Sequence, residues 1–240
     1  MEIKPIIIVL ADISGYTQFI KYHRVSLIHA EKIITELLES VIASARVPLI
    51  LHEIEGDAVS FYAIDDQEES CAREIFEQVE RFIDAFRSRE SELISECKVC
   101  ECDACARIGQ LRIKAVLHRG EAAFSKIQQF TKISGEGVIL AHRLLKNSIP
   151  SKEYILMTDQ FVRACPRIEE RSPERRTEHA EGLGEVTVHV IDLQQNGPVK
   201  AVERSRLSKV RMFFRLEGYL LKRLLGGKAK RLARVEKERS

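Results

Sequence analysis

LADISGYT, residues 10–17, joins two different hydrophobic patterns. The residues just before it, Ile6–Val9, are apolar and β-branched, which is typical of a buried strand. Behind it, apolar side chains recur at helical spacing: Phe19, Ile20, Leu27, Ile28, Ile33, Ile34, Leu37 and Leu38. Asp12 therefore lies where a buried strand ends and a helix is about to begin. Its carboxylate and the nearby backbone N–H groups of residues 13–17 suit a hard cation and a phosphate bound together.

The same stretch also has a purely structural interpretation, in which Asp12 or Ser14 only caps the helix. A second acidic stretch favours the ligand-binding interpretation. Leu49–Ile54 and Ala58–Ala63 have the composition of two strands, and the tight turn between them ends in Asp57. Two strand-end carboxylates can converge on one site as hard oxygen ligands for magnesium or manganese.

Three segments of the chain resemble motifs of the class III nucleotidyl cyclase catalytic domain. LADISGYTQF (10–19) is similar to the opening motif of that domain, and IEGDAVSFYA (54–63) is similar to its metal-binding hairpin. LRIKAVLHRGEAAF (111–124) and ISGEGVILAHRLLKNS (133–148) resemble its strand, glycine turn and late helix. The order and spacing agree over residues 5–193. With a cysteine cluster ahead of the third segment, the chain resembles a divergent bacterial branch of cyclase-like proteins.

The resemblance implies an α+β fold with the ferredoxin-like βαββαβ core of class III cyclases. The hydrophobic pattern predicts strands at 5–12, 48–63 (a hairpin), 111–117, 154–157 and 184–193, and helices at 16–43, 66–90, 137–147 and 158–165. We expect the helices to pack on one face of an antiparallel-rich sheet. We also expect His118–Glu121 to turn the chain back, and the charged residues 166–180 to form a loop.

We divide the chain into a cyclase-like domain at 1–195, with a Cys-rich loop at 97–105, and a basic C-terminal helix and tail at 196–240. The net charge of +2 hides this division, because from Lys200 onward fourteen basic residues oppose four acidic ones, a net +10 that leaves −8 for the rest. Residues 206–225 have the pattern of an amphipathic basic helix, which suits an anionic membrane surface. The pattern equally suits packing onto the domain or a dimer partner. No base-stacking motif accompanies the basic residues, so we do not expect nucleic-acid binding.

The N-terminal apolar run is not a membrane or export signal. Pro5–Ala11 is too short to span a membrane, and its flanks do not resemble a secretory signal. We therefore expect a cytoplasmic protein with reduced thiols, which lies at the inner membrane surface if its basic helix binds lipid.

The resemblance to class III cyclases implies a reaction and a set of residues. The reaction converts a nucleoside triphosphate to a 3′,5′-cyclic nucleotide and pyrophosphate, as a phosphorus–oxygen lyase in signalling. Asp12 and Asp57 would hold two magnesium or manganese ions. The triphosphate would face the backbone N–H groups of four residues: Ile13, Ser14, Gly15 and Tyr16. Arg143 would neutralise charge on the phosphate, and because the family shares this site between subunits, the resemblance also implies a homodimer.

Three positions depart from the family's pattern or limit what it implies. The family has an asparagine four residues before its arginine, where this chain has Ile139, which cannot hydrogen-bond a ribose. Glu53 falls where guanylyl cyclases carry glutamate and adenylyl cyclases lysine, and Lys132 falls where adenylyl cyclases carry aspartate. Glu53 and Lys132 would either read a base or pair with each other in a site that binds none. Two functions remain open: a nucleotidyl cyclase, or a catalytically degenerate cyclase-fold module that binds a nucleotide or regulates a partner.

A second metal site is predicted from the pattern C-x2-C-x-C-x2-C, formed by Cys97, Cys100, Cys102 and Cys105. Four thiolates match the ligand set of a structural zinc site. The middle spacer is unusually short, so three of these cysteines with an outside ligand such as His118 or His52 are an alternative. Reduced thiols, a redox-responsive loop and an iron–sulfur cluster are the other interpretations.

Overall fold

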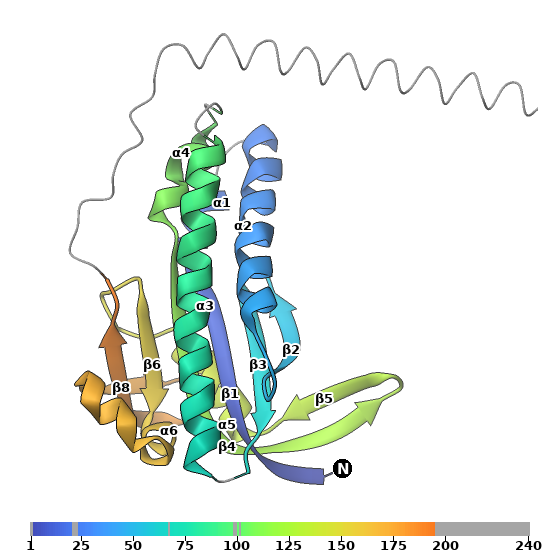
Figure 1. Cartoon of the computed structure of the whole chain (residues 1–240). Coiled ribbons are helices and arrows are strands. Elements are labelled where there is room, and N and C mark those ends of the chain that lie inside the picture. Colours follow the sequence, from blue (N-terminus) through green and yellow to red (C-terminus); the bar gives the residue numbers. More distant parts are fainter. Residues whose placement is uncertain (1, 21–23, 67, 98–99, 101, 195–240) are drawn as a thin grey trace, which may run out of the picture.

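The computed structural model describes residues 2–20, 24–66, 68–97, 100 and 102–194 (Figure 1). The predicted basic helix at 206–225 and the tail that follows it lie outside the described residues. The same is true of three positions in the Cys-rich loop.

The described residues form eight strands and six α-helices. The strands are β1 (Glu2–Ser14), β2 (Ile50–Glu55), β3 (Ala58–Ile64), β4 (Arg112–Ile127), β5 (Phe130–Ser134), β6 (Tyr154–Thr158), β7 (Glu174–Ala180) and β8 (Gly184–Asp192). The helices are α1 (Tyr16–Ile20), α2 (Arg24–Ser44), α3 (Glu69–Glu96), α4 (Asp103–Arg107), α5 (Glu136–Leu144) and α6 (Asp159–Ala164). Short 3₁₀ helices span Ile108–Gln110 and Pro166–Arg171.

The eight strands form one sheet in the order β2-β3-β1-β4-β6-β8-β7, with β5 paired to β4. Neighbouring strands are antiparallel except β4 and β6, which are parallel. Strands β1 to β4, with α2 and α3 between them, follow the βαββαβ order of a ferredoxin-like unit. The predicted α+β fold with this core is therefore confirmed.

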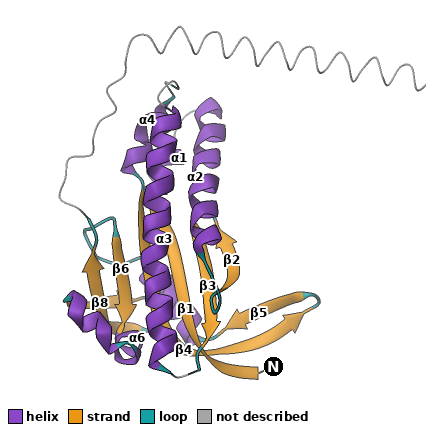
Figure 2. Ribbon diagram, in the orientation of Figure 1, coloured by secondary structure: helices purple, strands orange, loops and turns teal. Residues whose placement is uncertain are grey.

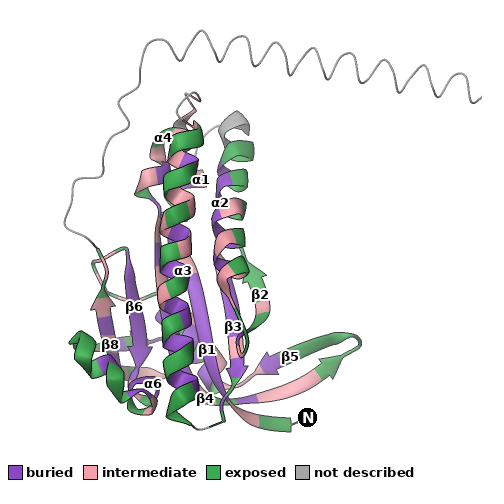
Figure 3. Cartoon of the chain, in the orientation of Figure 1, coloured by how far each residue is buried: buried purple, intermediate pink, exposed green. Residues whose placement is uncertain are grey.

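Strand β1 is buried on both faces, and this determines where the helices lie (Figures 2 and 3). Ile7 and Val9 belong to a core that includes residues of α2 and α3, whereas Ile6 and Ile8 belong to a second core that includes Leu140 of α5. The expectation that the helices lie on one face holds for α2 and α3 and is wrong for α5. Apolar side chains on the second face of β1 would otherwise meet water, so a helix must cover that face as well.

Strand β4 runs without interruption through His118–Glu121, where the sequence predicted a turn. Gly120 was the reason for that prediction, but here it makes room for a buried ring. A Cβ on Gly120 would lie 2.7 Å from His118 Nε2. The chain turns instead after β4, where Gln128 has a φ of 55°, and β4 and β5 form an arm that extends from the sheet (Figure 1).

The segment 166–180, predicted to be a charged loop, contains a 3₁₀ helix and strand β7. Strand β7 lies at the end of the sheet and pairs with β8. Glu178 and Ala180 are buried, while most of its other side chains are exposed or half-buried. Charged side chains are typical of edge strands, and they hide the alternating apolar pattern by which a strand is recognised.

The long helices also differ from their predicted boundaries. The structure has α1 and α2 in place of a single helix at 16–43, and the residues between them are not described. Helix α3 begins at Glu69 and ends at Glu96, so it extends beyond the predicted 66–90. Among the described residues, no helix combines the length and apolar character needed to cross a membrane.

A partly buried ion pair fastens α3 to the sheet. Arg87 donates from Nε and Nη2 to the two carboxylate oxygens of Glu153, at 3.0 and 2.9 Å. It also donates to the backbone oxygen of Leu193, at 3.0 Å. Arg87 therefore ties the middle of the helix to the start of β6 and the end of β8.

Candidate functional site

Two strand ends bring Asp12 and Asp57 together. Asp12 lies near the end of β1, opposite Ala58 on β3 and Lys114 on β4. Asp57 lies in the turn between β2 and β3, immediately before Ala58. The amide of Ile13 donates to the backbone oxygen of Asp57 at 3.1 Å, which ties the turn to the end of β1. Both aspartates line one cleft.

The cleft has a volume of about 330 Å³ and opens to solvent. It is lined by Asp12, Ile13, Ser14, Gly15, Tyr16, Thr17, Gln18, Asp57, Lys114 and Lys152. Its volume is in the range of small-molecule sites. Gly15 has a φ of +96°, a conformation that favours glycine and lets the chain turn from β1 into α1. The predicted metal pair and the predicted phosphate-facing residues therefore line a single surface.

The two carboxylates repel each other. The pKa of Asp57 is raised to about 6, mainly by burial and then by the negative charge of Asp12, while Lys114 opposes the shift. The pKa of Tyr16 is raised as well, by burial first and then by the charges of Glu31 and Asp57. A proton or a cation between the carboxylates relieves the repulsion, so their arrangement suits a divalent metal.

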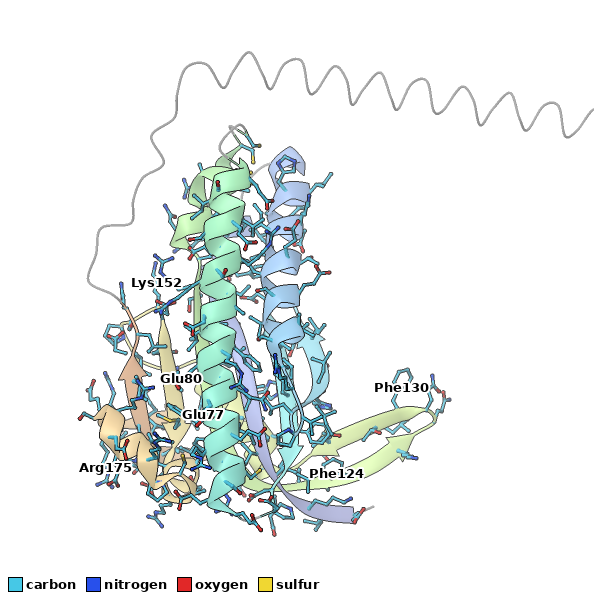
Figure 4. The ribbon with its side chains drawn as sticks, viewed as in Figure 1. Glu77, Glu80, Phe124, Phe130, Lys152 and Arg175 are labelled. Carbon is cyan, nitrogen blue, oxygen red and sulfur yellow. The ribbon has the colours of Figure 1, made fainter. Side chains whose placement is uncertain are left out.

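Two lysines that line the cleft were not among the predicted site residues. Lys114 Nζ lies 2.9 Å from Asp12 Oδ2 and donates to the backbone oxygen of Leu145, also at 2.9 Å. Lys152, which lies just before β6 (Figure 4), also lines this cleft. The charge of Lys114 inside the apolar run LRIKAVL was a signal that its side chain meets an acidic partner. The sequence around Lys152 carries no such signal.

The predicted base-reading residues and the predicted arginine do not line this cleft. Glu53 on β2 lines a separate hollow together with His142 of α5. Lys132 lies on β5 and is exposed. Arg143 lies on the exposed side of α5 and forms an ion pair with Glu181. Within a single chain, the predicted metal-binding aspartates therefore lie apart from the residues expected to contact the base and the reacting phosphate.

Helix α4, which carries the last cysteine of the Cys-rich loop, packs against α2 at the opposite end of α3 from the β4–β5 arm (Figure 1). Ligand atoms of four residues lie within 4.8 Å of one another: His29, Cys100, Cys102 and Cys105. His29 comes from α2, 71 residues before Cys100, and no motif in the sequence points to it. Three of the four predicted cysteines therefore come together, with a histidine that sequence reasoning missed.

The other predicted ligands fall outside this group of four. Cys97 ends α3 and contacts Cys105, but it falls outside the group of four. His118 Nδ1 lies 3.0 Å from Thr158 Oγ1 inside the sheet, and the pKa of His118 is lowered to about 4 by burial. His52 lies edge-on against a tyrosine ring on β3. Neither His52 nor His118 is part of the cysteine group.

A family model described as "Protein of unknown function (DUF2652)" matches residues 34–154. The chain belongs to the DUF2652 family. It is also 34% identical over 167 residues to an uncharacterised protein of Mycobacterium tuberculosis, Rv2561/Rv2562. That alignment covers 70% of the DUF2652 chain and 76% of the relative.

The DUF2652 chain is similar in fold to solved cyclase structures. It superposes on the adenylyl cyclase CyaB of P. aeruginosa with a TM-score of 0.61, covering 82% of this chain and 98% of that chain at 14% identity. A class III adenylyl cyclase-like ATP-binding protein from the same organism gives a TM-score of 0.56, covering 68% of this chain and 35% of that chain at 15% identity. At these identities the likeness establishes the cyclase fold and not the reaction.

Proposed function

We propose that the DUF2652 chain is a nucleotidyl cyclase-like protein of cyclic-nucleotide signalling. It binds a nucleoside triphosphate with magnesium or manganese and converts it to a 3′,5′-cyclic nucleotide and pyrophosphate. The proposal rests mainly on the pairing of Asp12 and Asp57 in one open cleft at the strand ends of a cyclase-type sheet. CyaB, which shares the fold, is an adenylyl cyclase.

The two carboxylates fit a divalent cation. They are hard oxygen donors, and the raised pKa of Asp57 reflects in part the charge of Asp12. A cation between them removes that repulsion, which Lys114 offsets only in part. Metal ions in such a site activate a hydroxyl and neutralise phosphate charge.

The residues around the pair suit a triphosphate. Ser14–Tyr16 line the cleft beside the aspartates, and Lys114 and Lys152 add positive charge to its wall. Ile13 lines the cleft, but its amide donates to the backbone oxygen of Asp57, so in this proposal the amides of Ser14–Tyr16 are the ones that face the phosphates. Positioning and charge neutralisation are the main requirements of chemistry at a phosphate.

A second copy of the chain completes the site in this proposal. Arg143 lies outside the aspartate cleft, and the surface around it is partly apolar: Ile139, one helical turn earlier, is 51% exposed. Phe130, at the tip of the β4–β5 arm, is 65% exposed (Figure 4). A homodimer would cover these side chains and bring Arg143 of one subunit to the aspartates of the other.

A second function is favoured by two observations. Lys114 already neutralises Asp12, and Ile139 stands where class III cyclases have the ribose-binding asparagine. A catalytically degenerate module would keep the cleft for binding a nucleotide and would regulate a partner. It would bind nucleotide and metal without releasing a product.

A product assay distinguishes the two functions. Purified full-length protein is incubated with ATP, GTP, CTP or UTP and manganese, and cyclic monophosphate is measured by mass spectrometry. We expect a product from the wild type that is lost in Asp57→Asn and kept in Asp84→Asn, a matched change at an exposed position of α3. Mixed Asp57→Asn and Arg143→Ala subunits should regain activity that neither has alone. Nucleotide binding without product in any reaction would establish the degenerate module instead.

The basic segment at 206–225 has its own test. We propose that it binds an anionic membrane surface, which would place a cytoplasmic protein at the inner membrane. The full chain should then sediment with vesicles that contain phosphatidylserine, and a chain lacking 206–240 should not. A full chain that stays in solution would leave packing onto the domain or the dimer partner as the role of this segment.

A further inference from the structure

The Cys-rich loop and α2 bring one imidazole and three thiols to a single point. His29 Nδ1 lies 3.4 Å from Cys102 Sγ and 3.6 Å from Cys100 Sγ. With Cys105, all four ligand atoms lie within 4.8 Å of one another. The thiols are free and form no disulfide.

These separations fit a tetrahedral metal site. With Zn–S bonds of about 2.3 Å and Zn–N bonds of about 2.0 Å, the N···S edge of a tetrahedron is about 3.5 Å long and the S···S edge about 3.8 Å. The two N···S distances given above already have the length of such an edge. Pairs as wide as 4.8 Å need to close by only about 1 Å, so side-chain movement alone can form the site.

The backbone prepares the loop for a metal. Cys102 caps the N-terminus of α4, and its Sγ accepts a hydrogen bond from the amide of Cys105 at 3.4 Å. An N–H donor stabilises the thiolate form that a metal ligand needs. Three thiolates and one imidazole in tetrahedral geometry are a zinc ligand set, in contrast to the oxygen ligands of magnesium or calcium.

We propose that the DUF2652 chain binds one zinc ion through His29, Cys100, Cys102 and Cys105. Cys97 is not a ligand in this site. It ends α3, and its backbone oxygen accepts from the amide of Cys100 at 3.0 Å, which shapes the loop that carries the ligands. The zinc joins α2 to α4, two helices that sequence reasoning did not connect.

The zinc also supports one wall of the cleft that contains Asp12 and Asp57. Helix α1 begins at Tyr16 in the cleft, and its Phe19 belongs to the same core as Ala104 of α4 and the neighbouring Ile108. Helix α1 contacts both α2 and α4, so a zinc ion that holds α4 against α2 also stabilises the position of α1. Loss of the metal would therefore loosen α1 while leaving Asp12 and Asp57 on their strands.

Metal content and ligand identity test the proposal on the full-length protein, purified under reducing conditions without chelator. Elemental analysis should find one zinc per chain. X-ray absorption at the zinc edge should find three sulfurs at about 2.3 Å and one nitrogen at about 2.0 Å. In competition with a chromophoric chelator, His29→Ala should weaken zinc binding about 100-fold or more. Cys97→Ser and His179→Ala, a change at an exposed histidine of β7, should leave the affinity within about twofold.

Three outcomes would overturn the proposal. Four sulfurs at the zinc, with full affinity in His29→Ala and loss in Cys97→Ser, would assign the site to the four cysteines. Iron in the purified protein would show that the metal is not zinc. Protein that carries no metal and takes up no zinc would show that these residues do not form a metal site. His29 is exposed, so its variant is expected to fold. Because no nucleotide enters these measurements, their result is independent of whether the chain is a cyclase.

Discussion

The ammonium group of Lys114 lies 2.9 Å from Asp12 Oδ2, across the pairing of β4 with β1. It also donates to the backbone oxygen of Leu145, so one lysine joins a candidate metal ligand to the end of α5. Asp12 is therefore partly neutralised before any metal binds. A metal ion in the cleft must displace Lys114 or share the carboxylate with it.

Lys114→Met removes this counter-charge. We expect the metal-free protein to lose about 2 kcal/mol of stability, which is roughly 4–8 °C in Tm for a domain of this size. Manganese should then stabilise the variant more than the wild type, because no ammonium competes for Asp12. Calorimetry with and without manganese measures both effects, with Lys126→Met on the exposed part of β4 as the control. An unchanged manganese response would mean that Lys114 and the metal do not share a ligand.

Asp57→Asn should stabilise the metal-free protein. The pKa of Asp57 is raised from its ordinary 3.8 to about 6. Between these pH values the folded chain holds a proton that the unfolded chain releases, so the free energy of unfolding falls as pH rises through the window. The variant removes this dependence. At pH 7.5 its free energy of unfolding should be higher than that of the wild type by about 1 kcal/mol, which raises its Tm by a few degrees.

The same variant tests the metal. Manganese should raise the Tm of the wild type at pH 7.5, should do so less at pH 5 where a proton competes, and should have no effect on Asp57→Asn. Melting curves across this pH range measure all three. A variant that manganese still stabilises would show that the cation binds elsewhere.

Gly137→Ala should destabilise the sheet from the α5 side. A Cβ on Gly137 would lie 2.8 Å from His118 Nε2, and the ring is held by its contact with Thr158 Oγ1. Overpacking of this kind costs about 1–3 kcal/mol. In the double variant with His118→Ala the cost of the new methyl group should largely vanish, so the two changes should be non-additive in denaturant unfolding. Simple additivity would show that the ring is not the obstacle.

Arg87→Met should be costly because it leaves Glu153 without its partner. The Glu153 side chain is only 5% exposed. Removing one partner of such a pair costs about 3 kcal/mol, whereas an exposed pair is worth about 0–1 kcal/mol. Arg163→Met, which removes an exposed pair with Asp159, is the matched control. Equal losses in urea unfolding would mean that Arg87 does not fasten α3 to the sheet.

The order of most strands and helices could be predicted because the hydrophobic pattern within each short stretch indicates its type. Asp12 and Asp57 each follow a strand-like run at a strand end, so their convergence needed only the sheet topology. The location of Gly120 was misleading, because a glycine in a strand and a glycine in a turn look alike until the neighbouring His118 ring is placed. Strand β7 was missed because it is an edge strand rich in charged residues, and its sequence has no alternating apolar pattern.

Contacts between distant segments could not be predicted. His29 reaches the cysteines only because α2 lies beside α4, and helix packing leaves no local mark in the sequence. Lys114 meets Asp12 through a strand register that depends on all of β1 and β4. Lys152 enters the cleft from a loop with no motif. Sequence reasoning thus found the candidate ligands near turns and missed the partners that the tertiary fold supplies.

Strand β1 is paired on both edges and buried on both faces, and this has a consequence during synthesis. Its Ile8 pairs with Tyr62 on one side and with His118 on the other. Strand β1 leaves the ribosome well before β3 and β4, and its second edge stays open until β4 has emerged. A nascent chain stalled before that point would expose an unpaired apolar strand, the kind of surface that aggregates or binds a chaperone.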